Sequence, residues 1–319
     1  MQTRTYGDLF KLIQSLAGVG SFAPTEADDI ANLINRRFLQ AFNESPIWPR
    51  YFVSSEKRDI LALTLSGATA STSTDVNQNY KLLGANTTGG LNVYQGVTTT
   101  TVIIYNTGTA WRVDTVASAA EQADGTFTVS GGTQQFIEAD TNKKDNITDV
   151  VTFTPRAGTD SLLVEGKNLI PYTQTGKTNI GSFNRIFRKQ AFLNQSAIEY
   201  EFFVDFTGAN ILNIASTTDN SAFVSYKKEF TPFTITVSNP VVVADFTGST
   251  VEVPAEFFAY IAHATYADFL RMDGQTDKAF AEENTASGAL ALELEKVDII
   301  SNNNTVNKRF STYVNRQSR

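Results

Sequence analysis

Few side chains in this sequence could carry acid–base or nucleophilic chemistry. The only histidine, His263, lies five residues before Asp268, and the two could in principle act as an acid–base pair. No nucleophile accompanies them, and a general acid–base site needs partners within hydrogen-bond reach. The favoured interpretation of His263 is therefore a histidine packed in a core or at an interface.

Two further sets of residues have a chemical and a plainer interpretation. Glu199 and Glu201 share one face of an expected strand, as the two carboxylates of a glycosidase sometimes do. Alternating acids on a solvated strand are far more common, so a peptidoglycan or polysaccharide hydrolase is only the third hypothesis. Trp111 and Tyr105 could stack on a sugar ring, but aromatic residues beside a hairpin more often belong to a core.

Metal and cofactor sites have little support in the sequence. The segment 272–278 (MDGQTDK) resembles half of a calcium loop but lacks the further oxygen ligands and the terminal glutamate. With no cysteine and one histidine, zinc–thiolate sites and thiolate catalysis are excluded. No glycine-rich phosphate loop is present. We expect no enzymatic activity, no metal and no cofactor.

Length and charge narrow the class of protein further. With 319 residues, 41% of them hydrophobic, the chain can bury one large core or two ordinary ones and is expected to be soluble. Its formal charge of −7 argues against a surface that binds nucleic acid. No apolar run reaches the roughly 18 residues of a membrane span, and the first residues do not resemble a signal peptide. Synthesis in a cytoplasm is expected.

Amphipathic helices are predicted near both ends of the sequence. Apolar residues recur at helical spacing over four segments, which are 3–17, 25–43, 253–273 and 275–300. Each of these helices has an apolar stripe that must be buried, and the stripes of the others are its natural partners. The sequence therefore predicts one discontinuous helical bundle, built from both ends of the chain.

The middle of the sequence has the composition of β structure. Residues 66–160 are rich in Thr, Ser, Gly and Asn, with short alternating strands separated by turn residues. We predict an inserted all-β domain there, a sandwich or a small barrel. An antiparallel β region is predicted over 165–250. The expected fold class is α+β, with residues 1–65 and 161–319 as the core that carries the insertion.

The last segment, 301–319, contains no acidic residue. Its cations alternate with apolar side chains, and together they form the predicted docking set: Lys308, Arg309, Phe310, Tyr313, Val314, Arg316 and Arg319. Apolar anchors among cations suit an extended segment that folds onto an acidic, grooved partner. A disordered end is the plainer alternative.

Several short patterns resemble one family, the head-to-tail connector (adaptor) proteins of tailed bacteriophages, of the tail tubular protein A type. The similar segments include 6–10 (YGDLF), 34–42 (INRRFLQAF) and 199–205 (EYEFFVD). The most specific similarity covers 253–283, which begins VPAEFF and includes AHATYADFLRMDGQTDKA. The block 66–160 lies outside the resemblance.

The resemblance implies a structural virion protein of the phage neck, assembled in the host cytoplasm. Such a protein forms a ring of roughly twelve copies that joins the portal protein to the next tail or nozzle protein, with tail fibres as a further contact. The segment 302–319 would dock on the portal. Viral DNA would pass through the ring without sequence-specific binding, repelled by acids predicted to line the channel: Glu282, Glu283, Glu293 and Glu295.

The main alternative is a receptor-binding or fibre-attachment protein. In that interpretation the block 66–160 does the binding and the helices only oligomerise. In the adaptor interpretation the role of the block is open: it could decorate the outside of the neck, contact fibres or capsid, or bind host-surface glycan weakly, strengthened by display in a ring.

Overall fold

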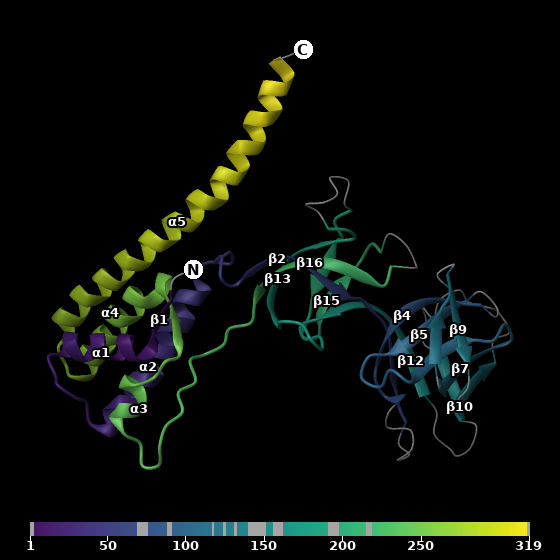
Figure 1. Cartoon of the computed structure of the whole chain (residues 1–319), viewed down its shortest axis with the longest axis horizontal. Helices are drawn as coiled ribbons and strands as arrows, with labels where there is room; N and C mark the ends of the chain where they lie inside the picture. Colours follow the sequence, from purple (N-terminus) through teal and green to yellow (C-terminus); the bar gives the residue numbers. More distant parts are fainter. Residues whose placement is uncertain are drawn as a thin grey trace. The chain divides into compact units, whose positions relative to one another are not determined.

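The protein combines α-helices with mainly antiparallel sheets and divides into two compact units (Figure 1). The computed structural model describes residues 3–68, 76–87, 91–116, 118–123, 126–130, 133–139, 151–155, 162–190, 198–214 and 219–317. The terminal unit consists of Met1–Phe52 and Glu229–Arg319, and the central unit of Val53–Lys228. The strands of the predicted core region 165–250 thus belong largely to the central unit. Among the described residues, no helix is both long and apolar enough to cross a membrane.

The terminal unit is helical. Its helices are α1 (Tyr6–Ala17), α2 (Pro24–Asn43), the short α3 (Val243–Thr247), α4 (Ala255–Met272) and α5 (Thr276–Gln317). They lie where helices are predicted, apart from α3. Two short strands, β1 (Thr3–Thr5) and β17 (Glu252–Pro254), pair with each other.

Because of this strand pair, two helices begin later in the sequence than predicted. Residues 3–5 pair with 252–254, so α1 begins at Tyr6 and α4 at Ala255. Thr5 caps α1 by accepting a hydrogen bond from the Asp8 amide, and Asp8 accepts one from the Thr5 amide in return. At the other end Gly18 adopts φ 70°, the left-handed conformation that ends helices.

Aromatic side chains fill the core of the terminal unit. Phe38 of α2 stacks on Phe233, with ring centroids 4.4 Å apart, and Trp48 meets Phe257 of α4 edge to face. The core draws its residues from 6–48 and 233–297. Segments that are far apart in the sequence therefore share one hydrophobic interior.

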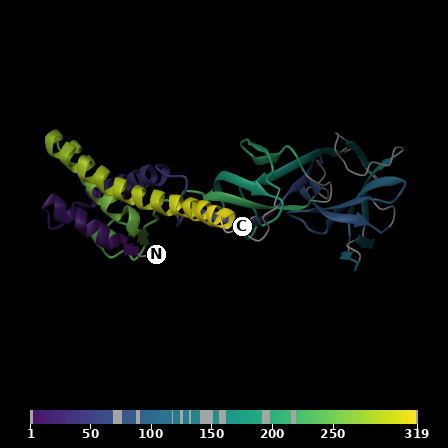
Figure 2. The same ribbon diagram turned by 90° about the horizontal axis from the view of Figure 1, so that it is seen from above.

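Helix α5 packs along α4 and then continues past it. Its buried residues Ala279, Ala286, Leu290 and Val297 recur at helical spacing. Both views show the later part of α5 running beyond the other helices of the terminal unit (Figures 1 and 2). The expectation of an extended segment over 301–319 is therefore wrong through Gln317. Residues 301–317 contain neither glycine nor proline, so the helix meets no breaker there.

The central unit contains the β structure. Its strands are β2 (Phe52–Asp59), β3 (Leu61–Ser66), β4 (Asn79–Asn86), β5 (Asn92–Gly96), β6 (Val102–Asn106), β7 (Ala110–Thr115), β8 (Ser118–Glu121), β9 (Thr126–Ser130), β10 (Thr133–Ala139), β11 (Val151–Pro155), β12 (Leu162–Pro171), β13 (Ile180–Phe187), β14 (Phe202–Val204), β15 (Gly208–Ile211) and β16 (Ser221–Lys228). The larger sheet has the order β14-β15-β12-β11-β10-β7-β6-β5-β4-β9-β8, and the smaller β13-β16-β2. β3 pairs with both β12 and β4.

Strand β12 and the segment 60–66, which consists of Ile60 and β3, contribute to two hydrophobic clusters of the central unit. Leu63 and Val164 belong to one cluster, and Ile60 and Ile170 belong to the other. Ser66, the first residue of the predicted insertion 66–160, pairs with Leu163, which lies three residues beyond its predicted end. Strand β12 and the segment 60–66 therefore each contribute to both clusters.

Candidate functional site

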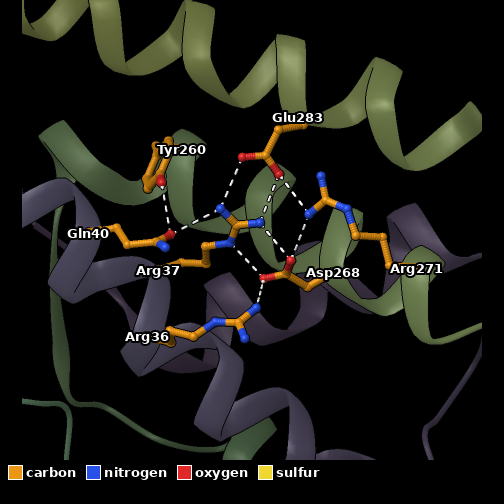
Figure 3. A network of polar contacts seen from close by, with 7 residues as sticks. All are labelled: Arg36, Arg37, Gln40, Tyr260, Asp268, Arg271 and Glu283. Atoms are coloured by element: carbon orange, nitrogen blue, oxygen red, sulfur yellow. Dashed lines mark hydrogen bonds and ion pairs between the residues drawn. The ribbon is translucent and has the colours of Figure 1, made fainter. Parts of the chain in front are cut away.

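The most elaborate polar arrangement of the terminal unit surrounds Arg37, which is only 6% exposed (Figure 3). Its Nε and Nη2 donate to the two carboxylate oxygens of Asp268, each at 2.6 Å. Its Nη1 and Nη2 donate to the carboxylate of Glu283 at 3.0 and 2.8 Å, and Nη1 also donates to Gln40 Oε1 at 3.0 Å. The guanidinium thus uses its whole fork of donors to join α2, α4 and α5.

Two more arginines complete this network, which we call the arginine clamp (Arg36, Arg37, Asp268, Arg271 and Glu283). Arg36 Nη2 donates to Asp268 at 2.6 Å. Arg271 Nη1 donates to Asp268 at 2.9 Å and to Glu283 at 3.1 Å. Asp268, buried and bound by three arginines, is held in its ionised form.

The electrostatics of the clamp favour full ionisation. Burial alone would raise the pKa of Asp268, but the hydrogen bonds and positive charges of Arg37 and Arg36 outweigh it and hold the pKa below its usual range. Burial opposes the charge of Arg37, yet hydrogen bonds to Asp268 and Glu283 raise its pKa. The clamp therefore acts as a structural lock, because a saturated carboxylate is a poor proton acceptor.

The imagined acid–base pair of His263 and Asp268 does not form, because Asp268 is bound by the clamp. His263 Nδ1 lies 2.7 Å from Glu282 Oε2 instead, which joins α4 to α5. This agrees with the favoured interpretation of a packed histidine. Glu199 and Glu201 are both exposed, and Glu199 lies 3.8 Å from Arg185. Trp111 is 1% exposed, which places it in a core.

The predicted channel acids have the following neighbours. Glu283 belongs to the clamp, Glu282 contacts His263, and Glu293 accepts a hydrogen bond from Lys296 at 2.6 Å. Glu295 is exposed on α5. A channel-lining role stays a prediction for all four.

The predicted docking residues Lys308, Arg309, Phe310, Tyr313, Val314 and Arg316 lie within α5, and their side chains are outside the described part of the structure. Arg319 lies outside the described residues. The docking role therefore stays a prediction, now for a helical segment.

A shallow groove of about 580 Å³ lies between α1, α4 and α5. Its apolar lining comes from Leu12, Ala255, Phe258 and Ala259, and we call it the α4 groove. Arg4 and Lys296 lie at the same groove, and the Arg4 guanidinium is 4.7 Å above the ring of Phe258.

The arginine clamp was missed in the sequence, although one signal was present. Ile30, Ile34, Arg37 and Ala41 follow one another at intervals of three and four residues, and the other three are buried core residues. A cation at a stripe position predicts a buried partner of opposite charge, because burying an unpaired charge is costly. Which acid provides this negative charge depends on how residues far apart in the sequence pack together.

Comparison with family models, with curated proteins and with solved structures gives no significant match for this chain.

Proposed function

We propose that this protein is a structural, non-enzymatic adaptor of the phage neck, a ring-forming subunit that joins the portal to the next tail protein. The proposal rests on one observation. The first and last segments of the sequence build a single helical unit, and α5 of that unit continues through residues 301–317 of the cationic segment 301–319. The finer architecture that we propose is a discontinuous helical bundle carrying an inserted β domain.

The arrangement of titratable groups supports a structural role. Asp268 and Glu283 are bound by the clamp arginines, and Glu282 contacts the only histidine. These contacts tie α4 to its neighbours and leave the same groups poorly suited to move a proton to or from a substrate. Rigid attachment of α4 and α5 is what a subunit needs if it is to transmit load between neighbours.

A helical docking segment changes the expected mode of portal binding. Positions 310, 313 and 314 fall on one side of a helix, since residues three and four apart are neighbours there. An amphipathic helix can lie in an apolar groove, with flanking cations facing acidic residues on the rim. We therefore propose a helix-in-groove contact with an acidic portal surface.

The test is co-purification of the full chain with the portal protein from the same phage. Deleting 302–319 should abolish binding while the terminal unit stays folded, because its described core ends at Val297. Averaged electron micrographs of the wild-type complex should show a symmetric ring on the portal. Wild-type protein that fails to bind the portal would overturn the proposal.

A charge variant refines this test without shortening the helix. Replacing Lys308, Arg309 and Arg316 by alanine should weaken portal binding and make it less sensitive to salt. The matched control replaces three exposed lysines of the central unit, Lys57, Lys177 and Lys189, by alanine. Equal weakening by both variants would show that portal binding responds to overall charge rather than to this segment.

A further inference from the structure

The hairpin of β14 and β15 in the central unit presents apolar side chains to solvent. Phe206, at its turn, is 93% exposed, and Leu212 and Phe203 are 62% and 51% exposed. Phe203 and Leu212 lie on the same face of the hairpin, because Phe203 pairs with Asn210 and side chains alternate along a strand. A phenylalanine left almost wholly in water is unfavourable unless a partner covers it.

The turn that carries Phe206 is rigid. Asp205 Oδ1 accepts hydrogen bonds from the Thr207 amide at 2.7 Å, the Thr207 hydroxyl at 2.6 Å and the Gly208 amide at 3.2 Å. Its Oδ2 accepts from Asn210 Nδ2 at 2.7 Å. Gly208 adopts φ 152°, and any Cβ there would collide with the carbonyl oxygen of Ile170. A preorganised turn loses little entropy on binding, which suits a docking element.

The charge around the hairpin indicates the kind of surface that would receive it. The segment 199–212, which includes the hairpin, contains Glu199, Glu201 and Asp205 and no lysine or arginine, and of these acids Glu199 lies 3.8 Å from Arg185 of β13. An anionic segment with an aromatic tip is poorly suited to anionic lipid and well suited to an apolar pocket with cations at its rim.

The α4 groove of the terminal unit has this chemistry. Its apolar lining includes Leu12 and Phe258, and its volume is large enough for a phenylalanine side chain. The two groove glutamates already have cationic partners, since Glu256 contacts Arg50 at 3.2 Å and Glu293 contacts Lys296. Arg4 is exposed, so the edge of its guanidinium can meet a carboxylate.

We propose that the β14–β15 hairpin of one copy docks in the α4 groove of a second copy, with Phe206 as the anchor and Arg4 facing the acids of the hairpin. Such a contact joins two different surfaces, so each copy can bind one neighbour on each side, and successive copies close a ring or extend as a filament. The inference deepens the ring-forming part of the proposed function.

The test uses the full chain in solution, with its mass distribution measured over concentrations up to about 0.3 mM, which covers weak, transient interfaces. Phe206→Ser, which removes the anchor, and Ala259→Glu, which fills the groove with a negative charge, should each weaken self-association by roughly tenfold or more. Both positions are exposed, and circular dichroism verifies folding. Wild-type protein that stays monomeric at every concentration would overturn the proposal.

Mixing the two variants distinguishes this contact from a symmetric one. The Phe206→Ser copy keeps its groove and the Ala259→Glu copy keeps its hairpin, so a mixture should form dimers that neither variant forms alone. If the hairpins instead paired with each other, mixing would restore nothing, and that result would refute the groove as the acceptor.

A control and a comparison complete the design. Leu163→Ser changes another exposed apolar residue of the central unit, 37% exposed, and should leave self-association unchanged. If Phe206→Ser still forms rings on the portal, the hairpin contact is wrong but the adaptor function stands. If wild-type protein self-associates through Phe206 yet binds no portal, the contact stands and the adaptor function fails.

Discussion

At the scale of single residues, the arginine clamp is the most consequential feature. Arg37 on α2 binds Asp268 on α4 and Glu283 on α5, so one side chain connects segments more than 200 positions apart in the sequence. Such buried charges are tolerable only as a group, because each one left alone would be poorly solvated. Removing one member should therefore lower the free energy of unfolding by more than the net contribution of its own hydrogen bonds.

Replacing Arg37 by methionine tests this directly. The variant keeps an unbranched apolar stem but removes the guanidinium and leaves Asp268 and Glu283 without their main partner, so we expect the free energy of unfolding to fall by about 3–5 kcal/mol. Urea denaturation followed by the helical signal in circular dichroism measures the change.

Two further variants serve as comparisons for Arg37→Met. Arg37→Lys should lose much of the same stability, since an ammonium cannot reproduce the fork. The double variant Arg37→Met with Asp268→Leu should be more stable than Arg37→Met alone, because it removes the stranded charge. A single-variant loss below about 1 kcal/mol, typical of surface pairs, would show that the clamp is not buried in solution.

The lowered pKa of Asp268 predicts how stability depends on pH. A carboxyl whose pKa is lower when folded binds more protons in the unfolded state, so its contribution is complete above the unfolded pKa of about 3.9. That contribution is lost as the pH falls through the lowered, folded value. Asp268→Asn should therefore flatten the acid side of the stability curve measured by denaturant titration.

The control for this experiment is Glu295→Gln, which neutralises an exposed acid on α5. It should leave the wild-type pH dependence nearly unchanged. An Asp268→Asn protein with the full wild-type slope below pH 4 would contradict the assignment, although Asp8, Asp205 and Asp245, whose pKa values are also lowered, keep part of the slope in every variant.

At the scale of elements, the turn before β15 and helix α5 are held in place by different kinds of interaction. The turn before β15 is fixed by Asp205 and Gly208 through local hydrogen bonds and one close approach to β12. Helix α5 is fixed at its start by packing against α4, and its later part follows from the lack of a breaker. Substitutions should therefore act very differently in the two elements.

Gly208→Ala should destabilise the central unit by about 1–3 kcal/mol, because the backbone conformation is strained for alanine and the new methyl meets Ile170. The matched substitution Gly288→Ala on α5 meets no atom within 4 Å and should be neutral or stabilising, since alanine favours helix. Thermal unfolding of both variants measures the difference. An equally stable Gly208→Ala protein would show that the turn can relax.

The helices were predictable because their signals are local. The apolar stripe and the early acids of 25–43 suffice for α2, which the structure places at Pro24–Asn43. The strand pair β1–β17 was not predictable, since Thr3–Thr5 reads as the start of a helix until its distant partner is known. Composition could not show whether 301–317 is extended or helical. To predict the clamp, one would have to know which acid on α4 or α5 contacts Arg37, and that depends on how distant segments pack.

At the scale of the whole molecule, the two units have separate hydrophobic interiors. The core of the terminal unit uses residues from 6–48 and 233–297, whereas the clusters of the central unit lie between Ile60 and Tyr226. The chain leaves the terminal unit along β2 and returns along β16, which are neighbouring strands of one sheet. The exit and the return are thus close together within the central unit.

Replacing Val53–Lys228 by a short Gly/Ser linker should therefore leave a folded terminal unit with its clamp intact. Circular dichroism should show a mainly helical protein with cooperative thermal unfolding, and Arg37→Met should destabilise it as it does the full chain. A shortened protein without cooperative unfolding would mean that the terminal unit needs the central unit to fold.

The strand pair β3–β12 has one more consequence within the central unit. Strand β12 contributes Val164 to one cluster and Ile170 to the other, while β3 contributes Leu63 to the first and begins directly after Ile60 of the second, so melting one cluster frays the pairing on which the other depends. The two clusters should consequently exchange amide protons as one block and give a single heat-absorption peak in scanning calorimetry. The paired backbone of β3 and β12, with one irregularity between Gly166 and Leu169, is thus the physical link through which the opening of one cluster reaches the other.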